Sequence, residues 1–286
     1  MCAEVVSALR ESGYLIKYFD VTFGLSIESF PNEIHAASAI LAVNYFGFPC
    51  DLTPFTAIAM ANDCVVIEDN AHGWLSSDEF GRPLGSRTGV GFTSFRKSIR
   101  VVDGAILHLD NSLFHKVNPL TPSNMALPLG FRVRQLCSKT EEVLHIPLMN
   151  VGRAGSRFVR RLVDKDLDPH SAVSEHEHIM GIHKSSLEKL SLTNIHHERA
   201  RRRHLFTRCL TISKPLDAEP VFKELPQYVV PLGFPFYGDS RVAETFARKV
   251  FRLGLEVFRW PALPTDIAGD SLPDHYRSMW LVNFLR

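Results

Sequence analysis

Two charged side chains, Asp69 and Lys97, follow apolar runs at points where a buried strand would end. Asp69 stands in the stretch VVIEDNAHGW, in which apolar residues lead directly into Glu68, Asp69 and Asn70. Lys97 stands in TSFRKSIRVVDGAIL, between two further apolar runs. A lysine amine in an enclosed connection of this kind can act as a nucleophile when it is desolvated or paired. A buried carboxylate, in turn, requires a partner for its charge.

Each of the two residues also has an ordinary structural explanation. Lys97 could be a lysine of a surface loop, and Asp69 could cap a helix or form a turn. Together, however, they match what pyridoxal 5'-phosphate requires of a protein. A lysine binds the aldehyde, and a carboxylate keeps the pyridine nitrogen protonated so that the ring can act as an electron sink. The pair therefore predicts a pyridoxal-phosphate site.

The elements that would position this pair alternate between strands and helices over the first 110 residues. Continuous apolar strands separated by helices predict a mostly parallel sheet with helices on both faces. Ligands of such sheets bind at the C-terminal ends of the strands, where Asp69 stands. We predict helices at 3–13 and 54–64, and strands at 16–21, 39–46, 64–68, 89–95 and 104–110.

The rest of the chain predicts a second, smaller α/β region. A charged helical region covers about 171–212, and a strand at 227–236, an amphipathic helix at 239–254 and a strand at 255–260 follow it. We expect a large cofactor-binding domain at 1–150, a helical connection at 151–212 and a small C-terminal domain at 213–286.

Four segments carry a resemblance to a known family. In this order, VNYFGFPCDL, VVIEDNAHGW, GRPLGS and TSFRKSIRVVDGAIL resemble the DegT/DnrJ/EryC1/StrS family of sugar aminotransferases. The resemblance covers about residues 1–110 and extends more loosely through FRWPALP. It implies the pyridoxal-phosphate-dependent transferase fold of type I, and a large domain that is N-terminally incomplete relative to the family.

The resemblance also implies roles for four residues. Lys97 would bind the cofactor aldehyde and then carry a proton between substrate and cofactor. Asp69 would bind the pyridinium nitrogen, His72 would lie beside the ring near its phenolic oxygen, and Ser94 would donate to the phosphate. His72 could instead be a turn histidine, and Ser94 an ordinary hydroxyl at the end of a strand.

The activity that the resemblance implies is amino sugar biosynthesis. The substrate would be a keto sugar, nucleotide-linked in most such enzymes, the amino donor would be glutamate or glutamine, and the enzyme would be a homodimer. The alternative is a truncated, catalytically inactive relative that acts only as an interaction or structural protein. A sugar dehydratase is disfavoured, because the related dehydratases replace the lysine with histidine and this chain keeps Lys97.

Composition argues against several other classes of protein. The 286 residues include 32 basic and 31 acidic ones, and this balance favours neither nucleic acid nor an anionic membrane surface as a partner. The basic run HHERARRRH at 196–204 is therefore interpreted as a solvated helix face. No apolar run approaches the roughly 18 residues of a membrane span. Five cysteines without a CxxC pair indicate reduced thiols and a cytoplasmic protein.

Metal and nucleotide motifs are weak or missing from the sequence. His176, His178 and His183 lie close together, but no cysteine or HExxH pattern accompanies them, so we predict no metal site. No GxGxxG opens a helix and no GxSxG occurs, which disfavours a dinucleotide-dependent dehydrogenase and an α/β-hydrolase.

Overall fold

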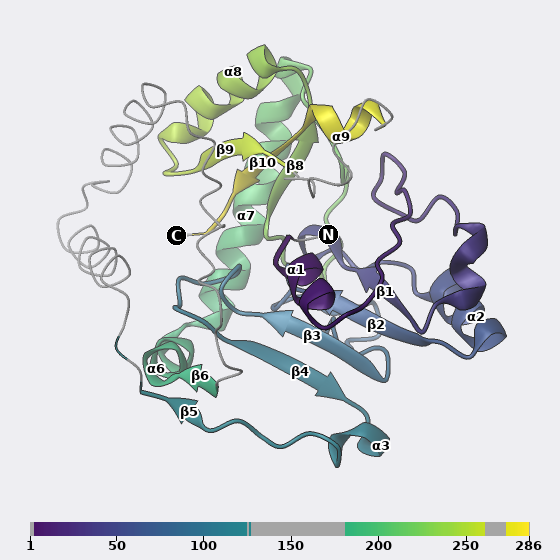
Figure 1. The fold of residues 1–286 in the computed structure, drawn as a ribbon. Helices are drawn as coiled ribbons and strands as arrows, with labels where there is room; N and C mark the ends of the chain where they lie inside the picture. Colours follow the sequence, from purple (N-terminus) through teal and green to yellow (C-terminus); the bar gives the residue numbers. More distant parts are fainter. Residues whose placement is uncertain (1–2, 125, 127–180, 261–272, 286) are drawn as a thin grey trace. The chain divides into compact units, whose positions relative to one another are not determined.

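The computed structural model describes residues 3–124, 126, 181–260 and 273–285 (Figure 1). The chain divides into two compact units. The larger unit contains Met1–Arg100, Ala105–Asn118 and Leu192–Arg286, and the smaller contains Val101–Gly104 and Pro119–Ser191. The domain boundaries expected at residues 150 and 212 stay a prediction, because residues 127–180 lie outside the described part of the chain.

A four-stranded sheet in the larger unit carries Asp69. Its strand order is β1-β2-β3-β4, with β1, β2 and β3 parallel and β4 antiparallel to β3. The mostly parallel sheet that the sequence predicts is thus confirmed. The strands are β1 (Ala39–Val43), β2 (Val65–Asn70), β3 (Val90–Ser94) and β4 (Ala105–Leu109).

Helix α2 (Thr53–Asn62) connects β1 to β2, as the sequence predicts. It begins with a proline in its first turn, where a missing N–H costs nothing. It ends where Asp63 takes the left-handed conformation, with φ of 51°. Its apolar side packs on the first two strands and forms a small core of Ile40, Ala42, Phe55, Ala59 and Val66. Helix α1 (Ala3–Glu11) precedes this sheet in the chain.

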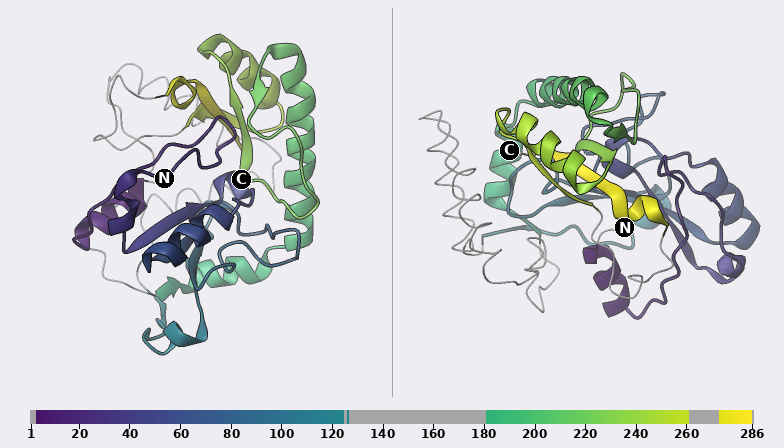
Figure 2. Two further views of the ribbon diagram at one scale, coloured as in Figure 1. Left: turned by 90° about the vertical axis from the view of Figure 1, so that its right-hand side faces the viewer. Right: turned by 90° about the horizontal axis from the view of Figure 1, so that it is seen from above.

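A second sheet in the larger unit is antiparallel throughout, with the strand order β7-β8-β10-β9. The long helix α7 packs against β7 and β8, and α8 packs against β9 (Figure 2). The elements are α7 (Ile195–Ser213), β7 (Glu219–Pro220), β8 (Gly233–Tyr237), α8 (Ser240–Phe251), β9 (Glu256–Arg259), α9 (Asp274–Ser278) and β10 (Met279–Asn283). Side-chain caps begin both long helices: Asn194 accepts from the His197 N–H, and Asp239 from the Val242 N–H.

The smaller unit contains a parallel pair, β5 (Pro122–Ser123) and β6 (Gly181–His183), followed by α6 (Lys184–Leu192). Asp103 organises the start of α6. Its carboxylate accepts hydrogen bonds from the His183 N–H at 3.0 Å and from the Ser186 hydroxyl at 2.8 Å.

The predicted elements differ from the structure in several places. Residues 16–21 form no strand, and only an isolated bridge joins Val21 to Ile27. The strand predicted at 39–46 ends at Val43, because Phe46 adopts a positive φ of 55° in the short 3-10 helix η2 (Tyr45–Gly47). Strand β10, which lies between β8 and β9, was not predicted.

Membrane-spanning helices and metal-binding clusters can be assessed only within the described residues. Within them, no helix is both long enough and apolar enough to cross a membrane. The same part of the chain contains no cluster of three side chains suited to a metal ion. His176 and His178 lie outside the described residues, so the metal prediction there stays untested.

Candidate active site

Asp69 is a buried carboxylate near the C-terminal end of β2. The residue is only 3% exposed, and its Oδ1 atom accepts a hydrogen bond of 2.8 Å from the Ala71 N–H. Burial raises the pKa of Asp69 above its usual range, while the Ala71 hydrogen bond and the charge of Lys97 act in the opposite direction. A cation near this carboxylate would therefore relieve a real desolvation cost.

Lys97 lies in the turn of residues 95–99 that follows β3, and this segment is called the Lys97 turn below. The turn is closed by its own backbone, because the Ser98 and Ile99 N–H groups both donate to the Phe95 carbonyl at 2.8 Å. The Lys97 side chain is partly exposed, and its charge acts on both Asp69 and His72. Because β2 and β3 are parallel neighbours, Asp69, His72 and Lys97 all lie at the same edge of the sheet.

His72 is held as a neutral imidazole. The Phe46 N–H donates to Nδ1 at 3.2 Å, so the ring hydrogen stands on Nε2. Burial, together with the charge of Lys97, lowers the pKa of His72 well below its ordinary value. The Phe46 ring stacks on the imidazole with a centroid distance of 5.5 Å, and Trp260 meets it edge-on at 6.3 Å. His72 therefore offers an N–H donor, and aromatic side chains pack against its ring.

Ser94 is the last residue of β3 and lies opposite Ala105 on β4. Its side chain is partly exposed. Among the hydrogen bonds of the described residues, none joins its hydroxyl to Asp69, His72 or Lys97. The role of Ser94 toward a phosphate remains a prediction.

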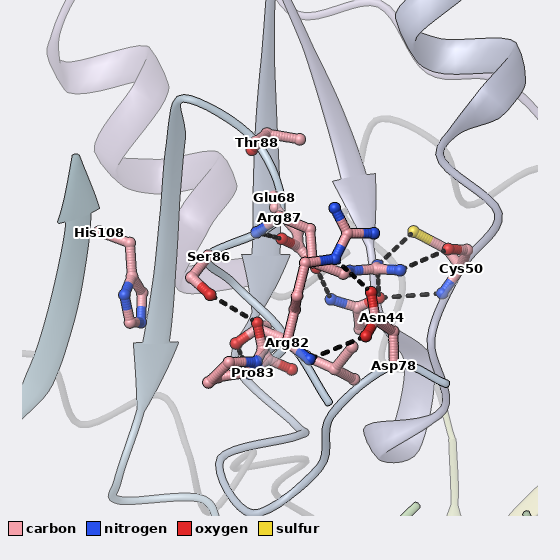
Figure 3. A network of polar contacts seen from close by, with 12 residues as sticks. Asn44, Cys50, Glu68, Asp78, Arg82, Pro83, Ser86, Arg87, Thr88 and His108 are labelled. Carbon is pink, nitrogen blue, oxygen red and sulfur yellow. Dashed lines mark hydrogen bonds and ion pairs between the residues drawn. The ribbon is translucent and has the colours of Figure 1, made fainter. Parts of the chain in front are cut away.

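Glu68 precedes Asp69 on β2, and successive side chains of a strand point to opposite faces. The Glu68 residue is fully buried and forms an ion pair with Arg87, from Nε to Oε1 at 2.7 Å (Figure 3). The Arg87 N–H donates to Oε2 at 2.8 Å, and the Asn44 amide donates to Oε1 at 2.8 Å. Glu68 is thus fully committed to structural contacts.

The same network extends to the loop after β1. Arg87 Nη2 donates to Asn44 Oδ1 at 2.8 Å, and Nη1 donates to the Cys50 carbonyl at 3.2 Å. The Cys50 N–H also donates to Asn44 Oδ1, at 2.9 Å. Burial raises the pKa of the Cys50 thiol to about 11, which keeps this thiol protonated beside Arg87. Sequence reasoning missed Arg87, because a single arginine in a turn-rich stretch carries no recognisable pattern.

The expectation that residues 196–204 form a solvated helix face was wrong for two arginines. Arg202 is only 1% exposed, and the side chain of Arg201 is nearly as buried. Both guanidinium groups pair with Glu198 at 2.6 Å. Arg202 also donates to the Ser98 carbonyl of the Lys97 turn. The one signal in the sequence was Glu198 itself, placed three and four residues before the two arginines.

Comparison with known proteins defines the class of this fold. A DegT/DnrJ/EryC1/StrS aminotransferase from Brucella abortus superposes with a TM-score of 0.58 at 14% identity, over 99% of this chain and 72% of that one. The Escherichia coli GDP-4-keto-6-deoxy-D-mannose-3-dehydratase with bound hydrated pyridoxal phosphate superposes with a TM-score of 0.56 at 14% identity, over 96% and 71%. The chain therefore has the type I fold of pyridoxal-phosphate-dependent aminotransferases, as predicted.

Sequence comparison matches the first part of the chain to a family. Residues 3–123 match the DegT/DnrJ/EryC1/StrS aminotransferase family, which confirms the resemblance found in the sequence. The uncharacterized protein MJ1066 of Methanocaldococcus jannaschii is 32% identical over 93 residues. That match covers 32% of this chain and 24% of the relative, so the chain aligns with about a quarter of its length.

The residues present fit the cofactor that the fold implies. Asp69 offers a buried carboxylate whose pKa is raised by burial. Lys97 offers an amine at the same edge of the sheet, and His72 offers a neutral N–H donor. This donor set is the one required to hold a protonated pyridine ring and an aldehyde.

Proposed function

We propose that this chain is a cytoplasmic pyridoxal-phosphate-dependent aminotransferase that converts a nucleotide-linked keto sugar to an amino sugar. The amino donor would be glutamate or glutamine. The observation that carries the proposal is the grouping of Asp69, His72 and Lys97 at the C-terminal side of β2 and β3. The match of residues 3–123 to an aminotransferase family supports it.

The roles of the residues follow from their environments. The cofactor, when bound, supplies an electron sink for the carbon that loses its proton. Asp69 is ionised when it faces a positive charge, and it then keeps a proton on the ring nitrogen. The nitrogen of His72 that carries a hydrogen to donate is Nε2, because Nδ1 already accepts a hydrogen bond from the Phe46 N–H. Lys97 would bind the aldehyde, and its amine, once released, would be the base that moves the proton at the substrate carbon.

A half-reaction tests the proposal. The protein is loaded with pyridoxal phosphate, mixed with glutamate or glutamine, and followed by the loss of the visible band and the appearance of the keto acid. A nucleotide-linked 4-keto sugar should then restore the band and become aminated, as read by mass spectrometry. Wild type should complete both halves, whereas Asp69→Asn should bind the sugar but fail in the chemical step. Cofactor binding without either half-reaction would favour the catalytically inactive relative instead.

A further inference from the structure

The Lys97 turn is held by buried residues on both sides of the lysine, whereas Lys97 itself is only partly buried. Ser98 and Ile99 are 3% and 8% exposed, whereas Lys97 is partly exposed. Phe95 packs edge-on against Trp74 with a centroid distance of 5.2 Å. The internal hydrogen bonds of the turn all end at the Phe95 carbonyl, which leaves the Ser98 carbonyl to find a donor elsewhere. The Ser98 carbonyl, one residue after Lys97, is therefore a point at which another element can hold the turn.

Arg202 supplies that donor from a position 104 residues further along the chain. Its Nη2 donates to the Ser98 carbonyl, Nη1 donates to the Pro231 carbonyl at 3.4 Å, and Nε donates to Glu198 at 2.6 Å. One buried guanidinium thus joins the Lys97 turn, the segment before β8 and helix α7. A planar fork can bond three such groups together, whereas a lysine ammonium lacks this geometry.

We propose that Arg202 is a positioning residue that fixes the Lys97 turn so that the Lys97 amine meets the aldehyde of the cofactor. The inference rests on the proposed function, because it assumes that Lys97 is the cofactor lysine. It adds to that function a residue on a distant helix that touches neither cofactor nor substrate. Arg202 acts through the backbone of Ser98 and through its pairing with Glu198.

Three variants separate positioning from general stability. Arg202→Met removes the fork but keeps a long side chain, and Glu198 still pairs with Arg201 at 2.6 Å. Arg202→Lys keeps the charge and serves as the conservative replacement should the methionine variant fail to fold. Leu205→Ala is the matched control, because Leu205 is buried on the same helix as part of the core and no hydrogen bond ties its side chain to the turn.

The first readout is where pyridoxal phosphate attaches. Each protein is incubated with the cofactor, reduced with borohydride and mapped by peptide mass spectrometry, and the label on Lys97 is divided by the label on the exposed Lys249. We expect the ratio to fall about tenfold or more in Arg202→Met and to a smaller extent in Arg202→Lys. Leu205→Ala should melt at a lower temperature yet keep the wild-type ratio. A folded Arg202→Met with the wild-type ratio would overturn the proposal.

The second readout is amide hydrogen exchange in the peptide that covers residues 95–99, measured without cofactor. Arg202→Met should exchange faster there than both wild type and Leu205→Ala, whereas unchanged exchange would contradict the anchoring role. This readout keeps the two proposals apart. If wild type shows no preference for Lys97, the proposed function fails, and hydrogen exchange still decides whether Arg202 holds the turn.

Discussion

Asp69 and Glu68 are neighbouring carboxylates on one strand with different partners. Glu68 has a full cation, Arg87, at 2.7 Å and two further hydrogen-bond donors. Among the described residues, Asp69 has one backbone donor, from Ala71, and the charge of Lys97 to offset its burial, and burial raises its pKa. Because a buried and under-compensated carboxylate is costly, Asp69 is the group in this sheet that stands to gain from a bound cation.

The raised pKa of Asp69 predicts how stability depends on pH in the cofactor-free protein. A carboxyl group whose folded pKa lies above its unfolded value contributes stability below the unfolded pKa of 3.8, and loses it as pH rises through the folded pKa. Asp69→Asn lacks this loss. The free energy of unfolding of the variant should therefore increase relative to that of wild type as pH rises from below 3.8 into the neutral range.

Urea unfolding of both proteins across that range measures the difference, and other titrating groups cancel because both proteins contain them. If the variant instead becomes less stable relative to wild type as pH rises, the folded pKa of Asp69 lies below its unfolded value, which contradicts the prediction. Pyridoxal phosphate should shift the stability difference at neutral pH in favour of wild type, because only the ionised wild-type carboxylate gains from the pyridinium.

The elements around the site are joined by one buried ion pair. Glu68 belongs to β2, Arg87 to the segment before β3, and Asn44 to the loop after β1, so the pair holds three neighbouring segments of the sheet together (Figure 3). The side chain of Glu68 is 0% exposed and that of Arg87 is 6% exposed. Removing one partner of such a pair leaves an uncompensated buried charge.

We therefore predict that Glu68→Ala and Arg87→Ala each lower the free energy of unfolding by about 3–5 kcal/mol. The double variant should lose clearly less than the two single losses added together, because it leaves no unpaired charge. A double-mutant cycle by chemical denaturation measures this coupling. Strictly additive losses would show that the pair contributes nothing beyond packing.

Local pattern was enough to predict the elements that carry Asp69 and Lys97, but not their long-range supports. The apolar runs of β1, β2 and β3 and the periodicity of α2 and α8 were visible in the sequence. The conformation of Phe46 was not visible there, because nothing in the local sequence predicts a buried aromatic residue at a positive φ of 55°. Arg202 was interpreted as solvated because runs of charge usually are, whereas its partners Ser98 and Pro231 lie far away in the chain.

At the scale of the whole chain, the sequence predicts a homodimer. The structure of a single chain does not test this prediction. The family resemblance implies a homodimer, and two-fold dimers are the commonest oligomers. We expect a homodimer at micromolar concentration in analytical ultracentrifugation, with a sedimentation coefficient that falls on dilution. A species that stays monomeric over the whole concentration range, with and without pyridoxal phosphate, would contradict this prediction.

The most direct test of the account is the site at which the cofactor attaches. Pyridoxal phosphate added to the protein should produce a visible absorption band, and borohydride should remove the band and leave the label on Lys97. Lys97→Ala should show neither the band nor the label, while its far-ultraviolet circular dichroism stays that of wild type. If the label lies on another lysine and Lys97→Ala keeps the band, Lys97 is not the cofactor lysine and the grouping with Asp69 and His72 is structural.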